Sequence, residues 1–322
     1  MNLFIIGAGF TKALFPEAPL NQELLQVLAQ RATDSASQRL LERYKIHDIE
    51  IALTRLDVDI ALSRTSAQAA DSELLKLRRA AEEDLGNYFE CYRASNELVS
   101  TALWLSRFIG HVISDGDVVV NLNYDCVFEG ALDCLGKWSL NGGYGSLNHS
   151  LVSDEQIPTS PVTVLKLHGS ITFRIAPYFD KPESMVVGFA INEGFFPTSG
   201  KNKHFEYGLG KGESYLIAPS YVKVPTLDIA YLMLDALKAA SEAKNLIIIG
   251  CSLRPEDTFL TLLLTGFLRQ PNWRERKIIV VDPQGEAITS RIKTYWGVKI
   301  PIIAIEGPVE ASVEQLLKTI NS

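Results

Sequence analysis

The sequence contains few cysteines, and none of them belongs to a short paired motif. The four are Cys91, Cys126, Cys134 and Cys251. Because no C-x-x-C spacing occurs among them, the sequence encodes neither a zinc ribbon nor a thioredoxin-type redox motif, and we expect no bound metal. A chain of 322 residues without a disulfide framework is typical of a reducing compartment, so we expect a cytoplasmic protein.

Long apolar runs and an excess of positive charge are also missing. No 18 consecutive residues are apolar, and the N-terminus has no basic segment ahead of a long apolar one, so we expect neither a membrane span nor a secretion signal. The net charge is −7, from 31 basic and 38 acidic residues. This balance argues against direct nucleic-acid binding, but it leaves room for a local basic pocket that holds a phosphate.

Helix-breaking residues are absent from a long N-terminal stretch. No proline occurs between Pro19 and Pro158, and Gly86 is the only glycine between Gly9 and Gly110. A stretch without these residues favours helices, and its leucines and isoleucines recur at helical spacing. We therefore predict a helical insert over about residues 20–115.

The following region has the opposite composition. Eleven of the 22 glycines and five of the 14 prolines lie between Gly136 and Gly212. Such a composition predicts loops and short strands. We therefore predict a second insert, of loops and strands, over about residues 171–225.

Six short apolar runs, rich in β-branched residues, are typical of buried strands. They are Leu3–Ile6, Asp117–Leu122, Val162–Leu167, Leu246–Ile249, Lys277–Val281 and Ile300–Ile305. The last three alternate with helical patterns, which implies parallel strands joined by right-handed crossovers. We predict an α/β fold: a single domain over residues 1–322, built on a Rossmann-like, doubly wound parallel sheet with a large helical insert.

Open parallel sheets bind ligands beyond the carboxyl ends of their strands. After the first strand, Gly7 and Gly9 let the backbone turn sharply and approach a phosphate. Ala8 and Thr11 belong to the same turn. A full dinucleotide fingerprint would have a third glycine or alanine where this chain has Lys12. The turn is thus a candidate phosphate site, or equally a structural strand-to-helix turn.

Polar residues follow the second and third strands. Asp125 is placed to cap the next helix, whereas Asn123, on the same strand end, is better explained by a ribose hydroxyl or a water that it binds. His168 is the only one of the five histidines at the carboxyl end of a strand, and Gly169 beside it leaves room for a ligand. An imidazole with an ordinary pKa near 6.5 suits general-base work, so we assign His168 a functional role.

Two later turns complete the candidate site. Gly250 and Ser252 follow the fourth strand and offer hydrogen bonds to a ribose or a pyrophosphate, although the same turn also serves to start a helix. Asp282 follows the fifth strand. Its carboxylate suits a ribose hydroxyl, but the Asp-Pro sequence equally suits a plain turn.

The order of these motifs is more specific than any one of them. Along the chain they read Gly-Ala-Gly-Phe-Thr, Asn-Tyr-Asp, Lys-Leu-His-Gly-Ser, Gly-Cys-Ser-Leu and Val-Asp-Pro. The series resembles the sirtuin superfamily, in particular the sirtuin-like domains of bacterial anti-phage defence NAD hydrolases. The matching turns run from residue 7 to residue 283, so the resemblance covers nearly the whole chain.

The resemblance implies NAD as the substrate and cleavage of its nicotinamide–ribose bond. By this likeness the pyrophosphate would lie against Gly7, Ala8, Gly9 and Thr11, the nicotinamide ribose against Asn123 and Asp125 with His168 as base, and the adenosine half against Gly250, Ser252 and Asp282. Protein-deacylating sirtuins also carry a zinc module of two C-x-x-C pairs and an Ile-Pro-Asp-Phe-Arg segment in the first loop. This chain has neither, which disfavours acyl-lysine chemistry.

The resemblance therefore predicts an NAD glycohydrolase that acts as a toxic effector in anti-phage defence. Two alternatives stay open: a sensor or assembly subunit that binds NAD or ADP-ribose without turnover, and an NAD-dependent ADP-ribosyltransferase. A toxic hydrolase must be restrained, so we expect a homo-oligomer or a defence partner such as an ATPase or a nuclease.

Overall fold

A parallel sheet of six strands forms the centre of the computed structural model, which describes residues 1–65, 72–140, 142–149, 160–178, 181–189, 196–198, 213–216, 227–269 and 275–322. Its strands are β1 (Asn2–Ile6), β2 (Val118–Asn121), β3 (Thr163–Leu165), β7 (Asn245–Ile249), β8 (Lys277–Asp282) and β9 (Ile302–Glu306). Their order is β3-β2-β1-β7-β8-β9, and every neighbouring pair is parallel. This is the 3-2-1-4-5-6 order of the Rossmann fold, so the predicted fold class is confirmed.

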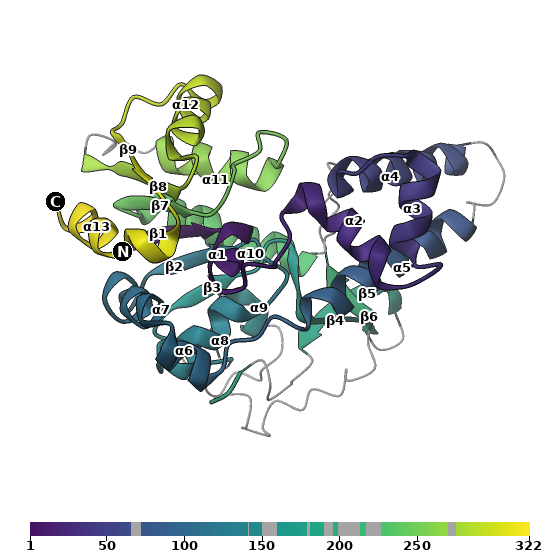
Figure 1. Ribbon diagram of the computed structural model, residues 1–322, viewed down its shortest axis with the longest axis horizontal. Coiled ribbons are helices and arrows are strands. Elements are labelled where there is room, and N and C mark those ends of the chain that lie inside the picture. Colours follow the sequence, from purple (N-terminus) through teal and green to yellow (C-terminus); the bar gives the residue numbers. More distant parts are fainter. Residues whose placement is uncertain are drawn as a thin grey trace.

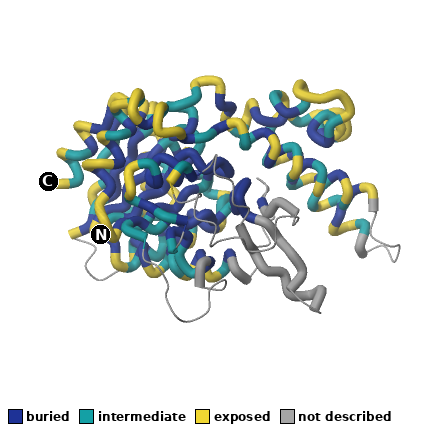
Figure 2. The backbone as a smooth tube through the Cα atoms, turned by 90° about the horizontal axis from the view of Figure 1, so that it is seen from below, coloured by how far each residue is buried: buried dark blue, intermediate teal, exposed yellow. Residues whose placement is uncertain are grey.

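Helices cover both faces of the sheet (Figures 1 and 2), which accounts for the buried, non-alternating central strands β1 and β7. One face carries α1 (Ala8–Leu14), α7 (Leu103–Arg107), the π-helical turn η1 (Phe108–Val112), α8 (Val127–Cys134) and α13 (Val309–Asn321). The other carries α10 (Leu227–Glu242), which contacts β2 and β3, and α11 (Thr258–Leu268). The helix α12 (Gly285–Trp296) packs on β8 and β9. The sheet is therefore doubly wound.

The residues of the predicted helical insert fall into two groups. The first forms a lobe beside the sheet: α2 (Asn21–Arg31), α3 (Ala36–Tyr44), α4 (Ile49–Thr65) and α5 (Ser72–Phe89) pack on one another (Figure 1). The second group, α6 (Asn96–Thr101) with α7 and η1, returns to the sheet. The Ser95 hydroxyl starts α6 by accepting a hydrogen bond from the amide of Leu98.

A second, antiparallel sheet lies in the predicted loop-and-strand insert. Its strands are β4 (Gly169–Tyr178), β5 (Lys181–Phe189) and β6 (Glu213–Leu216), in the order β5-β4-β6; the short helix α9 (Ser146–His149) precedes them. The helix α5 contacts β4 and β6 and so joins the lobe to this sheet. Apart from residues 196–198, the remainder of residues 171–225 lies outside the described residues. None of the helices in the described part has the length and apolarity needed to cross a bilayer.

Candidate functional site

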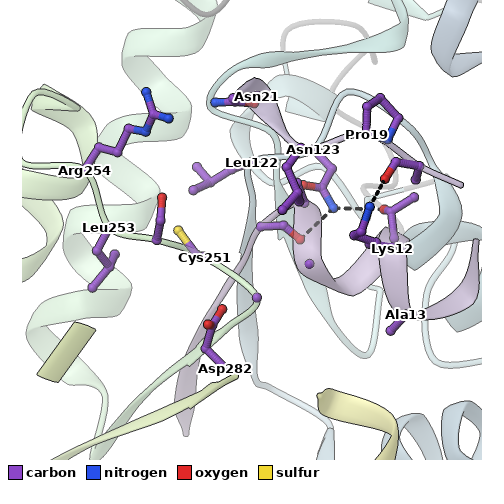
Figure 3. A pocket seen from close by; sticks show the side chains of 18 of the residues that line it. Lys12, Ala13, Pro19, Asn21, Leu122, Asn123, Cys251, Leu253, Arg254 and Asp282 are labelled. Carbon is purple, nitrogen blue, oxygen red and sulfur yellow. Dashed lines mark hydrogen bonds between the residues drawn. The ribbon is translucent and has the colours of Figure 1, made fainter. Parts of the chain in front are cut away.

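A cavity opens at the carboxyl ends of β1 and β7, where the strand order reverses direction. Its volume is about 610 Å³, within the range of small-molecule sites. The residues predicted from the sequence all line it: Gly7, Ala8, Gly9, Thr11, Asn123, Asp125, His168, Gly250, Ser252 and Asp282. Two of them, Asn123 and Asp282, can be followed in Figure 3. Because the strands are parallel, turns that are distant in the sequence meet at one edge of the sheet.

The two glycine turns are packed directly against each other. The amide of Gly9 donates to the carbonyl of Gly250 at 2.9 Å. A Cβ atom on Gly9 would lie 2.7 Å from the Cα of Gly250. A Cβ atom on Gly7 would lie 2.6 Å from the carbonyl oxygen of Gly250. Gly250 itself has a φ of +56°. These glycines are therefore required for turn-on-turn packing, whatever ligand the cavity takes.

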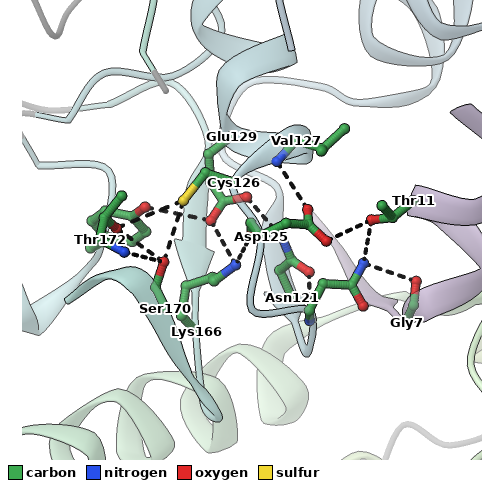
Figure 4. Close-up of polar contacts among 12 residues, drawn as sticks. Gly7, Thr11, Asn121, Asp125, Cys126, Val127, Glu129, Lys166, Ser170 and Thr172 are labelled. Atoms are coloured by element: carbon green, nitrogen blue, oxygen red, sulfur yellow. Dashed lines mark hydrogen bonds and ion pairs between the residues drawn. The ribbon is translucent and has the colours of Figure 1, made fainter. Parts of the chain in front are cut away.

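Asn123 is held by its amide nitrogen. Its Nδ2 donates to the carbonyl of Gly7 and to the hydroxyl of Thr11, both at 3.1 Å, and its backbone amide donates to the Oδ1 of Asn121 (Figure 4). The two hydrogens of the amide group are thus both used within the protein. What Asn123 can offer a ligand is its side-chain oxygen, Oδ1, which can accept a hydrogen bond from a ribose hydroxyl or a water.

Thr11 and Asp125 support this arrangement from behind. The Thr11 hydroxyl donates to the Oδ2 of Asp125 at 2.9 Å, while the Oδ1 of Asp125 accepts from the amide of Val127 at the start of α8. Asp125 was expected to cap α8, but the N-cap residue is Cys126; Asp125 precedes it, binds the first amide of the helix and orients Thr11 as well. Burial raises the pKa of the Asp125 carboxyl above its ordinary value.

A buried ion pair, which the sequence interpretation missed, lies beneath Asp125. The Lys166 ammonium is 3.1 Å from a carboxylate oxygen of Glu129, and both side chains are fully buried. Lys166 also donates to the carbonyl of Asp125 at 2.5 Å, and Asn121 donates to Glu129 at 2.8 Å. Burial raises the pKa of Glu129. The available signal was the lysine in the Lys-Leu-His motif, a charged residue at the end of an apolar strand.

His168 follows β3 and contacts a carboxylate from the other half of the sheet. Its Nε2 lies 3.0 Å from the Oδ2 of Asp257, the N-cap residue of α11. Both residues line the cavity. Asp257 was not among the site residues predicted from the sequence. Asp257 ends the turn between β7 and α11 that begins with Gly250, at the same edge of the sheet. That position was the signal for a role in the site.

Ser252 and Asp282 lie at the β7–β8 side of the cavity. Ser252 is exposed, and its carbonyl accepts a hydrogen bond from Arg291. The Oδ1 of Asp282 accepts from the amide of Gln284 at 2.8 Å, which is the turn that the Asp-Pro sequence favours. Partial burial raises the pKa of the Asp282 carboxyl. Within the part of the chain that the structure describes, the second oxygen of this carboxylate remains available to a ribose hydroxyl.

The positive charges of the cavity lining are both engaged by the protein. Among the lining residues that the structure describes they are Lys12 and Arg254. Lys12 donates to the carbonyl of Ala18 at 2.8 Å, and Arg254 bonds to Glu50 at the start of α4. Neither was predicted. The site therefore presents a ligand mainly with hydrogen-bond acceptors and a histidine–carboxylate pair, because its two cationic side chains are already bound to protein groups.

Within the described part of the chain, no cluster of three or more His, Cys, Asp and Glu side chains is arranged to hold a metal ion. The chemistry that the site supports directly is proton transfer at His168 and hydrogen bonding to hydroxyl groups at Asn123 and Asp282.

Comparisons with known proteins give distant structural likenesses. No protein-family profile and no curated protein matches the chain. The solved structures that the chain resembles include a Sir2 homologue variant in complex with 2′-O-acetyl ADP ribose (12% identity, TM-score 0.43, 99% of this chain and 91% of that one). They also include a structure from work on the mechanism and regulation of Sir2 enzymes (13% identity, TM-score 0.44, 99% of this chain and 92% of that one). A further one is a Sir2 homologue variant in complex with ADP ribose (14% identity, TM-score 0.41, 100% of this chain and 91% of that one). At these values the likeness does not assign the chain to a family.

Proposed function

We propose that this chain is an NAD glycohydrolase that cleaves NAD to nicotinamide and ADP-ribose. One observation carries the proposal: Asn123 and His168, from the ends of different strands, line the same cavity at the switch point of a Rossmann sheet. Ligands of this fold lie across that point. The proposal agrees with the resemblance of the ordered motifs.

The lining suits a dinucleotide with two riboses. Hydroxyl-binding groups occur on both sides of the cavity: Asn123 on the β2 side and Asp282 on the β8 side. The turns that contain Gly9 and Gly250 lie at the centre of the sheet, between β1 and β7, where a pyrophosphate would cross. A backbone without side chains lets a phosphate approach closely.

The proposed reaction requires few catalytic groups. The bond between the ribose C1′ and the nicotinamide nitrogen breaks, and its electron pair returns to the ring, which leaves as a neutral molecule. A water oxygen bonds to C1′ through an oxocarbenium-like transition state, as in glycoside hydrolysis. His168 accepts the proton that this water loses, and Asn123 orients the water or the ribose hydroxyls through its carbonyl oxygen. The proton then passes to solvent.

The cellular role we propose is that of a cytoplasmic toxic effector in anti-phage defence, and it rests on the motif resemblance. We propose that assembly into a homo-oligomer, or a partner such as an ATPase or a nuclease, restrains the activity. The lobe α2–α5 is the proposed contact surface, because α4 exposes Ile51, Val58 and Leu62 on one side.

The test is to incubate the purified protein with NAD and to follow nicotinamide release. We expect the Asn123→Ala and His168→Ala variants to lose about 10²–10⁴-fold in kcat, the range for removal of an acid–base or orienting group. Asn96→Ala and His111→Ala are matched controls, because they remove the same side chains from exposed positions away from the cavity, and should release nicotinamide like wild type.

The outcomes separate the candidate functions. Unchanged turnover in either site variant would remove that residue from the mechanism. Tight binding of NAD or ADP-ribose in calorimetry with no nicotinamide release, alone or with neighbouring gene products, would replace the hydrolase with a sensor. Transfer of radiolabel from the ADP-ribose half of NAD onto protein would indicate a transferase.

A further inference from the structure

The contact between His168 and Asp257 joins the two halves of the sheet. His168 follows β3, at one edge of the sheet, and Asp257 starts α11 after β7. The Nε2 of His168 lies 3.0 Å from the Oδ2 of Asp257, and the two side chains are only 13% and 11% exposed. The pair is therefore largely shielded from water while it lines the cavity.

The carboxylate of Asp257 is fixed by the helix that it caps. Its Oδ1 accepts hydrogen bonds from the amides of Phe259 at 3.0 Å and Leu260 at 3.4 Å. These bonds fix the rotation of the carboxylate, so that Oδ2 is directed to the imidazole. The Phe259 ring lies 6.1 Å from the imidazole, between ring centroids. One helix terminus thus supplies both a polar and an apolar contact to His168.

We propose that Asp257 is the positioning residue for His168: its carboxylate keeps a proton on Nε2 and so fixes the tautomer of the imidazole that accepts the proton of the attacking water. The inference deepens the proposed NAD hydrolysis and, for its kinetic consequence, rests on it. A neutral imidazole has one N–H and one lone pair, and a carboxylate accepts only the N–H. When the imidazole takes up the proton of the water, the imidazolium that forms is stabilised by the adjacent carboxylate.

A purely structural role for Asp257, as the cap of α11, makes a different prediction. Asparagine, serine and aspartate are about equally good N-cap residues. The Asp257→Asn variant keeps the cap, but with Oδ1 bound to the helix amides its Nδ2 faces His168 and favours the tautomer protonated on Nδ1. The Asp257→Ser variant also keeps the cap, but its hydroxyl is too short to reach the ring. If Asp257 only caps, both variants should behave like wild type.

The experiment combines kinetics with the histidine tautomer. We expect Asp257→Asn to lower kcat for nicotinamide release by about 10³–10⁴-fold, the loss found when an asparagine imposes the wrong tautomer on a catalytic histidine, with little change in KM. We expect Asp257→Ser to lower kcat by a smaller factor, and the melting temperatures of both variants to stay near that of wild type. Labelling with ¹⁵N-histidine gives signals from only five residues, and the His168→Ala variant assigns the relevant one. That signal should change from the Nε2–H to the Nδ1–H tautomer in Asp257→Asn.

Two results would overturn the inference: a wild-type kcat in Asp257→Asn, or an unchanged tautomer of His168 in that variant. The tautomer is measured without substrate, so it tests the pair even if the wild-type protein releases no nicotinamide. In that case the proposed hydrolase would be wrong, and the ¹⁵N spectra alone would decide whether Asp257 sets the protonated nitrogen of His168.

Discussion

At the scale of single residues, Thr11 connects the groups around the cavity. Its hydroxyl accepts from the amide of Asn123 and donates to the carboxylate of Asp125, so one oxygen atom links α1 to the β2–α8 turn. The side chain is buried. The motif resemblance implied that Thr11 would meet the pyrophosphate. Its hydrogen bonds instead favour a role in holding Asn123 in place.

The Thr11→Val variant tests this role, because valine keeps the shape of threonine and removes the hydroxyl. Asn123 and Asp125 each lose a partner, which should cost about 1–3 kcal/mol of unfolding free energy. Misplacement of Asn123 should lower nicotinamide release by about 10²-fold. The Thr11→Ser variant retains the hydroxyl and should stay near wild type. Equal turnover in the two variants would contradict the role.

At the scale of elements, the site depends on two turns that touch. The turn after β1 and the turn after β7 approach so closely that a side-chain atom on either side would meet backbone. Gly250 combines this close approach with a left-handed φ of +56°. Gly297, at the end of α12, has a φ of +60° but open space around it. Comparing substitutions at Gly250 and Gly297 therefore separates the free-energy cost of a left-handed backbone from the free-energy cost of a steric clash.

We expect Gly250→Ala to destabilise the protein more than Gly297→Ala. Both substitutions place alanine in the left-handed region, at about 1–2 kcal/mol. Gly250→Ala should add about 1–3 kcal/mol, because its Cβ would lie 2.7 Å from the Cα of Gly9 and backbone cannot move aside cheaply. Urea unfolding of both variants measures the difference. Equal losses would show that the turns have room to separate.

At the scale of the whole molecule, the helical lobe and the sheet share the cavity. Arg254, in the β7–α11 turn, bonds to Glu50 and lies 3.5 Å from a carboxylate oxygen of Asp48, both at the start of α4. On the other side, the Phe89 ring of α5 lies 5.6 Å from that of Tyr124. The lobe is thus joined to the turns after β2 and β7, which both line the site.

We expect Arg254→Ala to loosen the lobe while the sheet stays folded. Loss of a partly exposed ion pair is worth about 1 kcal/mol, so amide exchange in α4 should accelerate roughly fivefold, with β7 and β8 unaffected. The measurement is hydrogen–deuterium exchange by mass spectrometry. Arg107→Ala is the control, because it removes an ion pair with Glu314 on α13, far from the lobe in the fold (Figure 1). Exchange in α4 that is the same in both variants would contradict a docking role for Arg254.

Much of the fold followed from local patterns in the sequence. The β-branched run Leu246–Ile249 is a strand buried on both faces, and the helical patterns that alternate with the last three strands are the helices α11, α12 and α13. Strands of this kind, alternating with helices, form a parallel sheet with right-handed crossovers, which permits few arrangements. The division of the helical stretch into a lobe and a part that returns to the sheet had no comparable signal, because amphipathic helices do not specify which surface they cover.

By itself the sequence determined which residues stand at the carboxyl ends of strands, and therefore that Asn123, His168 and Asp282 would reach one edge of the sheet. Only the tertiary structure decided which side chains these residues contact: Asp257 for His168 and Thr11 for Asn123. It also decided that Glu129 pairs with the buried Lys166. Periodicity and turn chemistry act over a few neighbouring residues and can be read along the chain. The contact between two side chains from distant elements depends on how closely those elements pack, and that distance is set by the whole core.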